Sequence, residues 1–301
     1  MVKKVRKLVF FSRKKSETLF MIFGALFPLL QFILFYVCVN GNQIILAFKR
    51  YDDSFAVFAG FENFKNVIND MLYDVVMKKA LLNSVICFGV TFLTIVLSIL
   101  LAFFWWKQVW TSGFIKILAL LPNLLSVSVF VMIYRYTVID FLPSVFNNET
   151  LGELLLPPKS LWTVLTIGFI LGFGPQSILF FGAMNGVSQD VVEYAKIDGF
   201  GVRHEFFKLI LPAVYPTFIS YTVIGLAGFF TNYGLIFTFF NTSADYAIRT
   251  VGYSLFVKIY TAVGYHDYPY VAASGIIFTL ITVPVIFIVK AVLEKVGPKE
   301  E

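Results

Sequence analysis

The sequence predicts an all-α integral membrane protein with about six transmembrane helices. Of its 301 residues, 58% are hydrophobic and only 14% are charged, and the mean hydropathy is +0.82. A soluble domain usually carries about 25% charged residues. The apolar runs are continuous and about 20 residues long, which suits spanning helices, whereas the strands of a membrane barrel are short and alternate in polarity. A lipid environment therefore explains the composition.

The chain begins with a basic tail, residues 1–18, which leads into a first apolar run at residues 19–39. This run is long enough to span a bilayer, and no small-residue cleavage site follows it. We therefore interpret it as a retained first helix and not as a signal peptide.

The other spans follow in order along a transmembrane domain that covers residues 19–293. They are expected at residues 81–104, 115–138, 161–184, 218–239 and 271–293, and a C-terminal tail follows at residues 294–301. In the fourth span, Gly174-Pro175 is expected to break the helix, because proline lacks an N–H and clashes with the preceding turn.

The distribution of basic residues predicts the orientation in the membrane. The larger share of the 24 Lys and Arg residues lies in the N-terminal tail and in the loops on the same side of the six spans. Cytoplasmic segments carry such an excess. Both termini are therefore predicted to be cytoplasmic, and the protein is expected to be a multi-pass protein of the bacterial plasma (inner) membrane.

Several function classes are disfavoured by what the sequence lacks. The net charge of +6 follows the tail and loops, which indicates membrane topology and no nucleic-acid partner. Cys38 and Cys87 lie in apolar runs, and His204 and His266 are expected on opposite sides of the membrane. No metal site, disulfide framework or catalytic residue is predicted from them. Without a Gly-x-x-x-x-Gly-Lys-[Ser/Thr] motif, the chain is predicted to be no enzyme and to bind no ATP or other cofactor itself.

The most informative segment is residues 186–212, here called the charged loop, which joins the fourth and fifth spans. Charged and histidine side chains crowd into it: Asp190, Glu193, Lys196, Asp198, Arg203, His204, Glu205 and Lys208. Ser188 or Asp190 is expected to cap a short helix, with Glu193 near the positive end of its dipole. Gly199 and Gly201 are expected to permit the turn that ends this helix.

A second helix is expected to start near Val202 and to carry apolar residues at helical spacing. The apolar residues of the two helices are Val191, Tyr194, Ala195 and Ile197 in the first and Phe206, Phe207 and Ile210 in the second. Two interpretations fit: a hairpin on the membrane surface, or a docking element for a cytoplasmic protein. The near-zero net charge of the loop argues against attraction to lipid.

The charged loop resembles the EAA motif of permease subunits in binding-protein-dependent ABC importers. Glu193, Ala195, Asp198, Gly199 and Pro212 match the pattern, and Tyr194 stands where the second Ala is usual. The resemblance extends along most of the chain, and the subfamily it resembles most is the first permease partner of the maltose, glycerol-phosphate and multiple-sugar type. The segments that carry it are Phe61-Glu-Asn-Phe64, Phe230-Thr-Asn-Tyr233, Thr250-Val-Gly-Tyr253 and Tyr270-Val-Ala-Ala-Ser274.

This resemblance implies the type I ABC importer permease fold and a subunit that carries a sugar or oligosaccharide. The first helix of the loop would be a coupling helix in a cleft of a cytoplasmic ATPase, where Gly199 sets the bend and Glu193 contacts the ATPase or caps its own helix. The coupling residues implied are Glu193, Tyr194, Ala195, Asp198, Gly199 and Arg203. The partners implied are a second homologous permease, two copies of an ABC ATPase that use ATP and Mg²⁺, and an extracellular sugar-binding protein.

Three polar residues in apolar surroundings are candidates for the substrate pathway: Gln176, Asn232 and Tyr233. The alternative for them is hydrogen bonding to neighbouring helices. The alternative for the whole protein is a secondary transporter or channel that is not coupled to ATP. Such proteins often keep ionisable residues within their spans, and these spans have almost none.

Overall fold

The computed structural model describes the backbone of residues 2–52 and 55–298, and the chain divides into two compact units. The first unit comprises Met1–Val67 and Val263–Ile276, and the second comprises Ile68–Ala262 and Ile277–Glu301. Helix α3 (Glu62–Tyr73) leads from the first unit into the second, and α14 (Tyr268–Val296) contributes to both. Each unit is described by itself below.

The first unit is built on one long apolar helix followed by a hairpin. The helix comprises α1 (Val2–Gln31), a π-helical segment η1 (Phe32–Cys38) and α2 (Val39–Ala47). Strands β1 (Lys49–Asp52) and β2 (Phe55–Phe58) then pair antiparallel.

The hairpin is tied to the end of α2 by Asn63 in α3. The side-chain amide of Asn63 donates to the carbonyl oxygens of Ala47 and Lys49, both at 2.8 Å. The first bond uses the carbonyl of Ala47, the last residue of α2, and the second holds Lys49, the first residue of β1.

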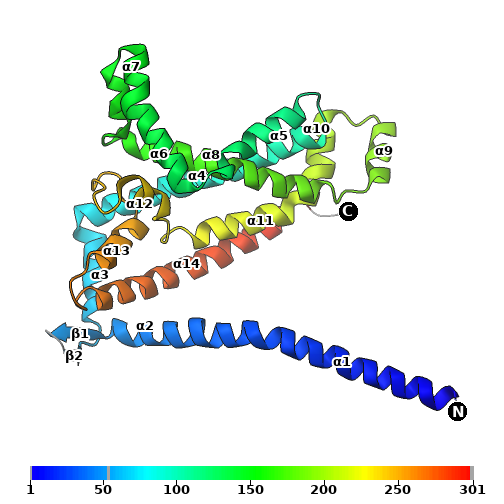
Figure 1. Cartoon of the computed structure of the whole chain (residues 1–301), viewed down its shortest axis with the longest axis horizontal. Helices are drawn as coiled ribbons and strands as arrows, with labels where there is room; N and C mark the ends of the chain where they lie inside the picture. The colour runs from blue at the N-terminus through cyan, green and yellow to red at the C-terminus, as the bar shows by residue number, and fades with distance from the viewer. Residues whose placement is uncertain (1, 53–54, 299–301) are drawn as a thin grey trace. The chain divides into compact units, whose positions relative to one another are not determined.

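The second unit is a helical bundle with short connecting turns (Figure 1). Its elements before the charged loop are α4 (Val75–Trp106), α5 (Ser112–Leu120), η2 (Leu121–Leu124), α6 (Val127–Tyr136), η3 (Thr137–Phe141), α7 (Leu142–Phe146), η4 (Glu149–Leu155) and α8 (Lys159–Met184). They are followed by α9 (Gln189–Ile197), α10 (Val202–His204), η5 (Glu205–Ile210), α11 (Leu211–Ala227), α12 (Gly234–Phe240) and α13 (Val251–Tyr260).

Helix α4 begins at a capped end and runs through the middle of the second unit. The Asp74 carboxylate accepts from the backbone N–H groups of Val76 (3.2 Å) and Met77 (3.0 Å), which have no partner within the helix. Two polar residues of α4 reach a distant segment: the Asn83 amide donates to the carbonyls of Ala247 and Arg249, both at 2.9 Å. The Ser84 hydroxyl accepts from the N–H of Val251 at 3.1 Å.

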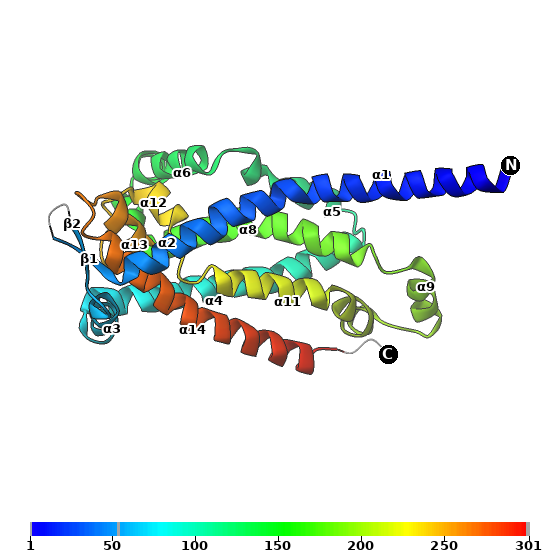
Figure 2. The same cartoon turned by 90° about the horizontal axis from the view of Figure 1, so that it is seen from below.

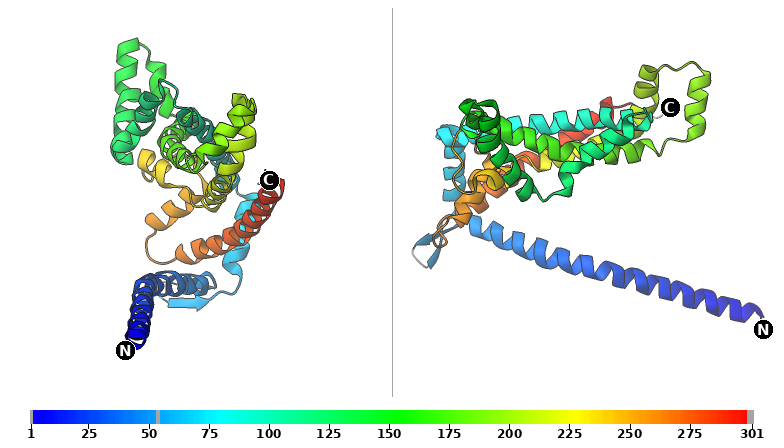
Figure 3. Two further views of the ribbon diagram at one scale, coloured as in Figure 1. Left: turned by 90° about the vertical axis from the view of Figure 1, so that its right-hand side faces the viewer. Right: turned by 45° about the horizontal axis from the view of Figure 1, so that its top comes forward.

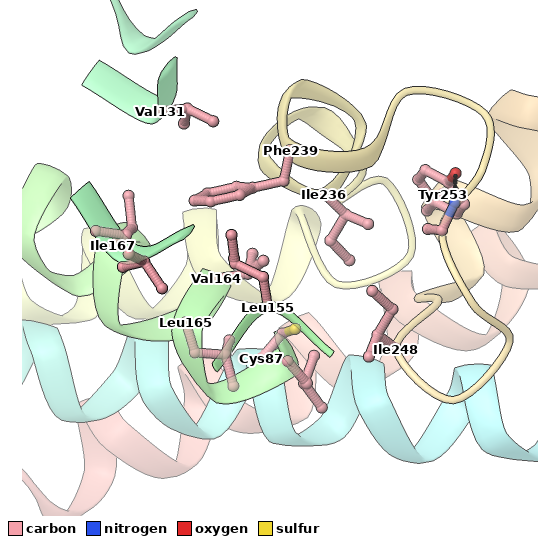
Figure 4. Close-up of a cluster of buried hydrophobic side chains, with 13 residues drawn as sticks. Cys87, Val131, Leu155, Val164, Leu165, Ile167, Ile236, Phe239, Ile248 and Tyr253 are labelled. Carbon is pink, nitrogen blue, oxygen red and sulfur yellow. Dashed lines mark hydrogen bonds between the residues drawn. The ribbon is translucent and has the colours of Figure 1, made fainter. Parts of the chain in front are cut away.

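The main core of the second unit lies where α4, α8, α12 and α13 meet, and Figure 4 shows part of it. Cys87 of α4, Val164 of α8, Phe239 of α12 and Tyr253 of α13 are all buried there. The Tyr253 hydroxyl donates to the Asn241 carbonyl at 2.7 Å, so its polar end is satisfied within the core.

A second buried cluster lies between α4, α8 and α11, which run side by side (Figure 2). Its residues are Ile95, Ile99, Ala102, Phe180, Met184, Ile210 and Val214. This cluster reaches the end of the bundle from which the charged loop projects, so the loop is joined to a packed region.

Six helices are long and apolar enough to cross a membrane, and their outer surfaces are apolar. They are Ser16–Ala47, Val75–Trp106, Val127–Phe146, Lys159–Met184, Val202–Ala227 and Tyr268–Val296. No more than 33% of the most apolar stretch of any of them is buried within the chain. Such large exposed apolar surfaces require lipid or partner subunits to cover them. The prediction of an all-α membrane protein with six spans is therefore confirmed.

Helix α8 corrects one expectation from the sequence. It continues without a break through Pro175, so the prediction that Gly174-Pro175 breaks it is wrong. The carbonyl oxygen of Phe173 accepts from the hydroxyls of Ser177 (2.6 Å) and Ser98 (3.3 Å). A spanning helix tolerates a proline where neighbouring helices support it, and α8 is packed along α4; the carbonyl that loses its donor is that of Leu171, one turn before Pro175.

Four of the helices contain the expected spans, and the other two are displaced along the chain. The third was expected at residues 115–138, but the chain leaves the helix near Pro122, and a new helix begins where the Ser126 hydroxyl caps the Val129 N–H at 3.3 Å. The fifth was expected at residues 218–239. Its helix starts earlier, at Val202, and ends before Gly228, and α12 is a separate short helix.

Candidate functional site

The charged loop lies at one end of the second unit, and α12 and α13 lie at the other (Figure 1). Helix α9 lies beyond the ends of α8 and α11 and runs across their direction (Figure 3). The loop therefore presents one short helix at the edge of the bundle.

The end of α9 is fixed by Gly199, as the sequence predicted. Its φ is +75°, which only glycine adopts without a steric penalty. The N–H of Gly199 donates to Lys196 O (3.1 Å), and the N–H of Phe200 donates to Ala195 O (2.9 Å). This pair of bonds is the Schellman motif, which satisfies the last carbonyls of a helix and turns the chain sharply. Gly201 has a φ of −74° and begins α10, so it does not need to be glycine for that reason.

The start of α9 differs in detail from the expectation. Ser188 occupies the N-cap position with an extended backbone, but its hydroxyl makes no capping hydrogen bond, and Asp190 lies in the first turn. Glu193 is held from within the helix, because the Gln189 amide donates to its carboxylate at 3.0 Å. Glu193 lies one turn after Gln189 and does not cap the helix.

The outer side of α9 is apolar and exposed. Val191 is 45% exposed, Tyr194 69% and Ile197 80%, and these residues recur at a spacing of three along one side of the helix. Ala195, one turn after Val191, is buried, whereas Glu193, Asp198 and Arg203 are exposed. Exposed apolar side chains flanked by charged ones are typical of a surface that a partner covers.

A cavity of about 200 Å³ lies farther along the bundle, between α4, α8 and α12. It is lined by Gln176 and Asn232, which the sequence singled out, together with Cys87, Val90, Thr91, Thr94, Val164, Leu165, Gly168, Phe169, Gly172, Leu235 and Ile236. Tyr233 does not line it: its ring stacks on Phe256 with the centroids 4.1 Å apart. The structure therefore brings together two of the three predicted pathway residues.

The polar groups of the cavity are uncharged, and one of them is unsatisfied. The hydroxyls of Thr91 and Thr94 donate to the carbonyls one turn earlier, those of Cys87 (3.0 Å) and Val90 (2.8 Å). In contrast, the buried Oε1 atom of Gln176 has no hydrogen-bond partner among the described residues. A buried acceptor without a partner is costly, so this oxygen stands out among the polar atoms near the cavity.

Sequence reasoning missed Thr91 and Thr94 because neither stands out from its apolar run. It also did not predict that the side chains of Lys107 and Glu205 meet, because the two residues are 98 positions apart. One signal in the sequence was available: charged residues are rare near the spans, and Lys107 and Glu205 each lie at the end of a span. In the described ranges, no three His, Cys, Asp or Glu side chains gather as a metal-ligand set.

The six spans, the projecting loop and the small internal cavity define a multi-pass membrane transport subunit with the fold of type I ABC importer permeases. The fold is shared with a solved chain of a bacterial ABC transporter that imports the acidic polysaccharide alginate. The TM-score is 0.72 at 16% identity, over 95% of this chain and 99% of that one. A second structure of a bacterial alginate ABC transporter, in complex with its alginate pentasaccharide-bound periplasmic protein, gives 0.68 at 17% identity, over 91% and 94%.

The chain belongs to the family described as the binding-protein-dependent transport system inner membrane component, whose model matches residues 94–300. A curated relative is the arabinooligosaccharides transport system permease protein AraP of Halalkalibacterium halodurans, 25% identical over 268 residues, which are 84% of this chain and 81% of that protein. The resemblance and the inner-membrane location predicted from the sequence are thus confirmed. The alternative of a secondary transporter or channel is set aside.

Proposed function

We propose that this protein is one permease subunit of an ATP-driven importer for a sugar or oligosaccharide, and that α9 couples it to a cytoplasmic ATPase. The observation that carries this proposal is α9, a short helix closed by Gly199 that projects from the bundle with an exposed apolar side. A helix of this form docks by laying its apolar side in a groove of another protein. Its mixed charges suit a protein groove better than an anionic bilayer.

The coupling residues have distinct parts in this proposal. Tyr194 enters the groove of the ATPase, and Glu193, held by Gln189, offers a carboxylate beside it. Ala195 is small and buried, which allows the turn after α9 to fold back against the helix. Asp198 and Arg203 are exposed on either side of that turn and are available for ion pairs with the ATPase.

The partners follow from what this chain lacks. It has no phosphate-binding loop, so ATP and Mg²⁺ are bound by two ATPase subunits. A second homologous permease completes the translocation pathway and covers apolar surface that the chain leaves exposed. An extracellular sugar-binding protein delivers the substrate, which the periplasmic protein in the related alginate complex supports. The excess of Lys and Arg supports a cytoplasmic position for the charged loop and for both termini.

The substrate class rests on the relatives and on the chemistry of the cavity. The curated relative is named for arabinooligosaccharides, and the related structures import alginate. The side chains of Gln176 and Asn232, with the ring of Phe169 in the same cavity wall, suit the hydroxyl groups of a sugar. A cavity of about 200 Å³ is smaller than the ~300–1,000 Å³ of typical ligand pockets, so an oligosaccharide has to pass between this chain and its partner permease.

The proposal is tested at Gly199, which is matched by Gly201 two residues later. No atom lies within 4 Å of a Cβ built at either position, so the two differ in backbone conformation and not in available space. Gly199→Val forces a branched residue into a left-handed conformation, at a cost of about 1–2 kcal/mol. We expect it to reduce both ATPase co-purification and sugar uptake by about tenfold, whereas Gly201→Ala leaves both unchanged.

The measurement uses membranes in which the amount of each variant is determined by immunoblot. If Gly199→Val and also Glu193→Lys retained the ATPase and transported normally, α9 would be a surface hairpin without a coupling role. If the wild-type protein co-purified with no ATPase, the proposal would fail as a whole.

A further inference from the structure

A partly buried ion pair joins the charged loop to α4. The Lys107 Nζ atom lies 2.7 Å from Glu205 Oε2, and the two side chains are 28% and 6% exposed. Lys107 follows directly after α4, and Glu205 begins the π-helical segment between α10 and α11. The other ion pairs between described residues, such as Lys159 with Glu153 at 55% and 49%, are about half exposed.

An aromatic contact lies beside this ion pair. The rings of Phe103 in α4 and Phe206 in the loop meet edge to face, with their centroids 5.0 Å apart. Ile210, one turn further on, is buried against α4 in the same cluster as Ile99. Apolar contacts of this kind are non-directional and permit sliding, whereas a charge-assisted hydrogen bond fixes two groups at one position.

Helix α9 is separated from the bundle by a hollow. A polar cavity of about 660 Å³ is lined by Gln189, Val192 and Lys196 of α9, and on its other side by the ends of α4 and α8. Lys107 and Glu205 line the same cavity. A movement of α9 therefore reaches α4 chiefly through the residues at the base of the loop, where the ion pair lies.

Separating Lys107 from Glu205 is expected to be strongly unfavourable in free energy. The second oxygen of Glu205, Oε1, is buried and has no hydrogen-bond partner among the described residues. The carboxylate therefore depends on Lys107 for its stabilisation, because a buried charge that loses its partner is strongly destabilising. As long as this ion pair is kept, the loop and the end of α4 have to move together.

We propose that Lys107 and Glu205 are positioning residues that transmit the displacement of the charged loop to α4. Helix α4 carries Thr91 and Thr94 in the wall of the internal cavity, so the pair connects movement at the ATPase to the wall that faces the substrate. The second route runs along the chain into α11 through the π-helical segment Glu205–Ile210. This inference rests on the proposed function, and it predicts that transport can be separated from docking.

The test compares charge reversal with charge exchange in the assembled importer, reconstituted in vesicles. Glu205→Lys places two ammonium groups together, and Lys107→Glu places two carboxylates together. We expect each single variant to retain the ATPase and its hydrolysis, while the sugar transported per ATP falls about tenfold. The exchange Lys107→Glu with Glu205→Lys restores the attraction and is expected to recover this ratio to within about threefold.

Glu153→Lys is the matched control, because it reverses one charge of an exposed pair with Lys159 outside the loop and the cavity. It is expected to leave the ratio unchanged. A single variant with a normal ratio, or an exchange as impaired as the singles, would overturn the inference. Loss of the ATPase in the singles and in the exchange would also overturn it, because the pair would then serve docking. Absence of an ATPase from the wild-type complex would instead contradict the proposed function.

Discussion

The charged loop and the interior of the bundle each depend on a glycine, but for opposite physical reasons. Gly199 has open space around it and a φ of +75°, so the loop requires its conformation. Gly174 in α8 has an ordinary helical backbone, but a Cβ there would overlap the carbonyl oxygen of Ala119 in α5. At the edge of the bundle glycine sets the direction of the chain, whereas inside the bundle it sets the distance between helices.

The charged loop and the cavity also differ in the charge and exposure of their polar groups. The loop exposes charged side chains to water, where a partner protein can reach them. The cavity contains only uncharged groups, of which the two threonine hydroxyls are satisfied within α4 and Gln176 Oε1 is not. This difference agrees with the roles proposed above, docking for the loop and passage of a neutral, hydroxyl-bearing substrate for the cavity.

Adding a methyl group at Gly174 is expected to have the largest effect on this comparison. Gly174→Ala forces α5 away from α8 and is expected to destabilise the fold by about 1–3 kcal/mol, although alanine favours the helix. The midpoint of thermal unfolding of the purified protein in detergent measures this. Gly182→Ala in the same helix is the control, because no atom lies within 4 Å of its Cβ position. Equal midpoints for the two variants would mean that α5 moves aside to accept the methyl group. Gly174 would then not be required for the close approach of α5 to α8.

A smaller effect, confined to transport, is expected in the cavity. Gln176→Ala and Asn232→Ala each remove a polar group that faces the cavity, and we expect sugar uptake to fall by about tenfold, the effect of one or two lost hydrogen bonds. The amount of assembled complex is expected to stay the same. Thr166→Ala serves as the control, because its exposed hydroxyl bonds only to Trp162 O at 2.8 Å in the same helix. Normal uptake in both cavity variants would show that these groups only join helices.

The smallest effect is expected at the hydrogen bond within α9. Gln189→Ala removes the amide that holds Glu193 at 3.0 Å, a contact worth about 0.2–0.5 kcal/mol on a helix surface. Titration of the ATPase against the purified permease should show affinity weakened by about twofold. Glu193→Ala, which removes the carboxylate itself, should weaken it more. A larger loss from Gln189→Ala than from Glu193→Ala would place Gln189 itself in the interface.

The sequence was sufficient for features that depend on neighbouring residues. The end of α9 at Gly199 and the start of the next helix at Val202 follow from local rules for glycine turns and helix starts. The six spans also follow from apolar length alone. The third span was predicted at the wrong residues because Pro122 and Ser126 lie inside a continuous apolar run. Pro122 indicates the end of one helix and Ser126 the start of the next.

Features that depend on distant residues could not be predicted. The cavity draws its polar groups from α4, α8 and the segment before α12, and only Gln176 and Asn232 stood out locally. The pairing of Lys107 with Glu205 needs the end of α4 and the start of the helix that leads into α11 to be packed together. The helix through Pro175 was mispredicted for the same reason, because the Ser98 hydroxyl that bonds beside it belongs to another helix.

The two hydrogen bonds of Asn83 have a consequence for the order of biogenesis. Their acceptors lie 164 and 166 residues further along the chain, so they form only after almost the whole protein has been synthesised and inserted. Until then α4 holds an amide with no protein acceptor, which is unfavourable in hydrocarbon. Newly inserted α4 therefore gains these two hydrogen bonds only when the segment that holds Ala247 and Arg249 packs against it. Truncated chains that lack residues 247–251 should be degraded faster by membrane proteases than the full chain.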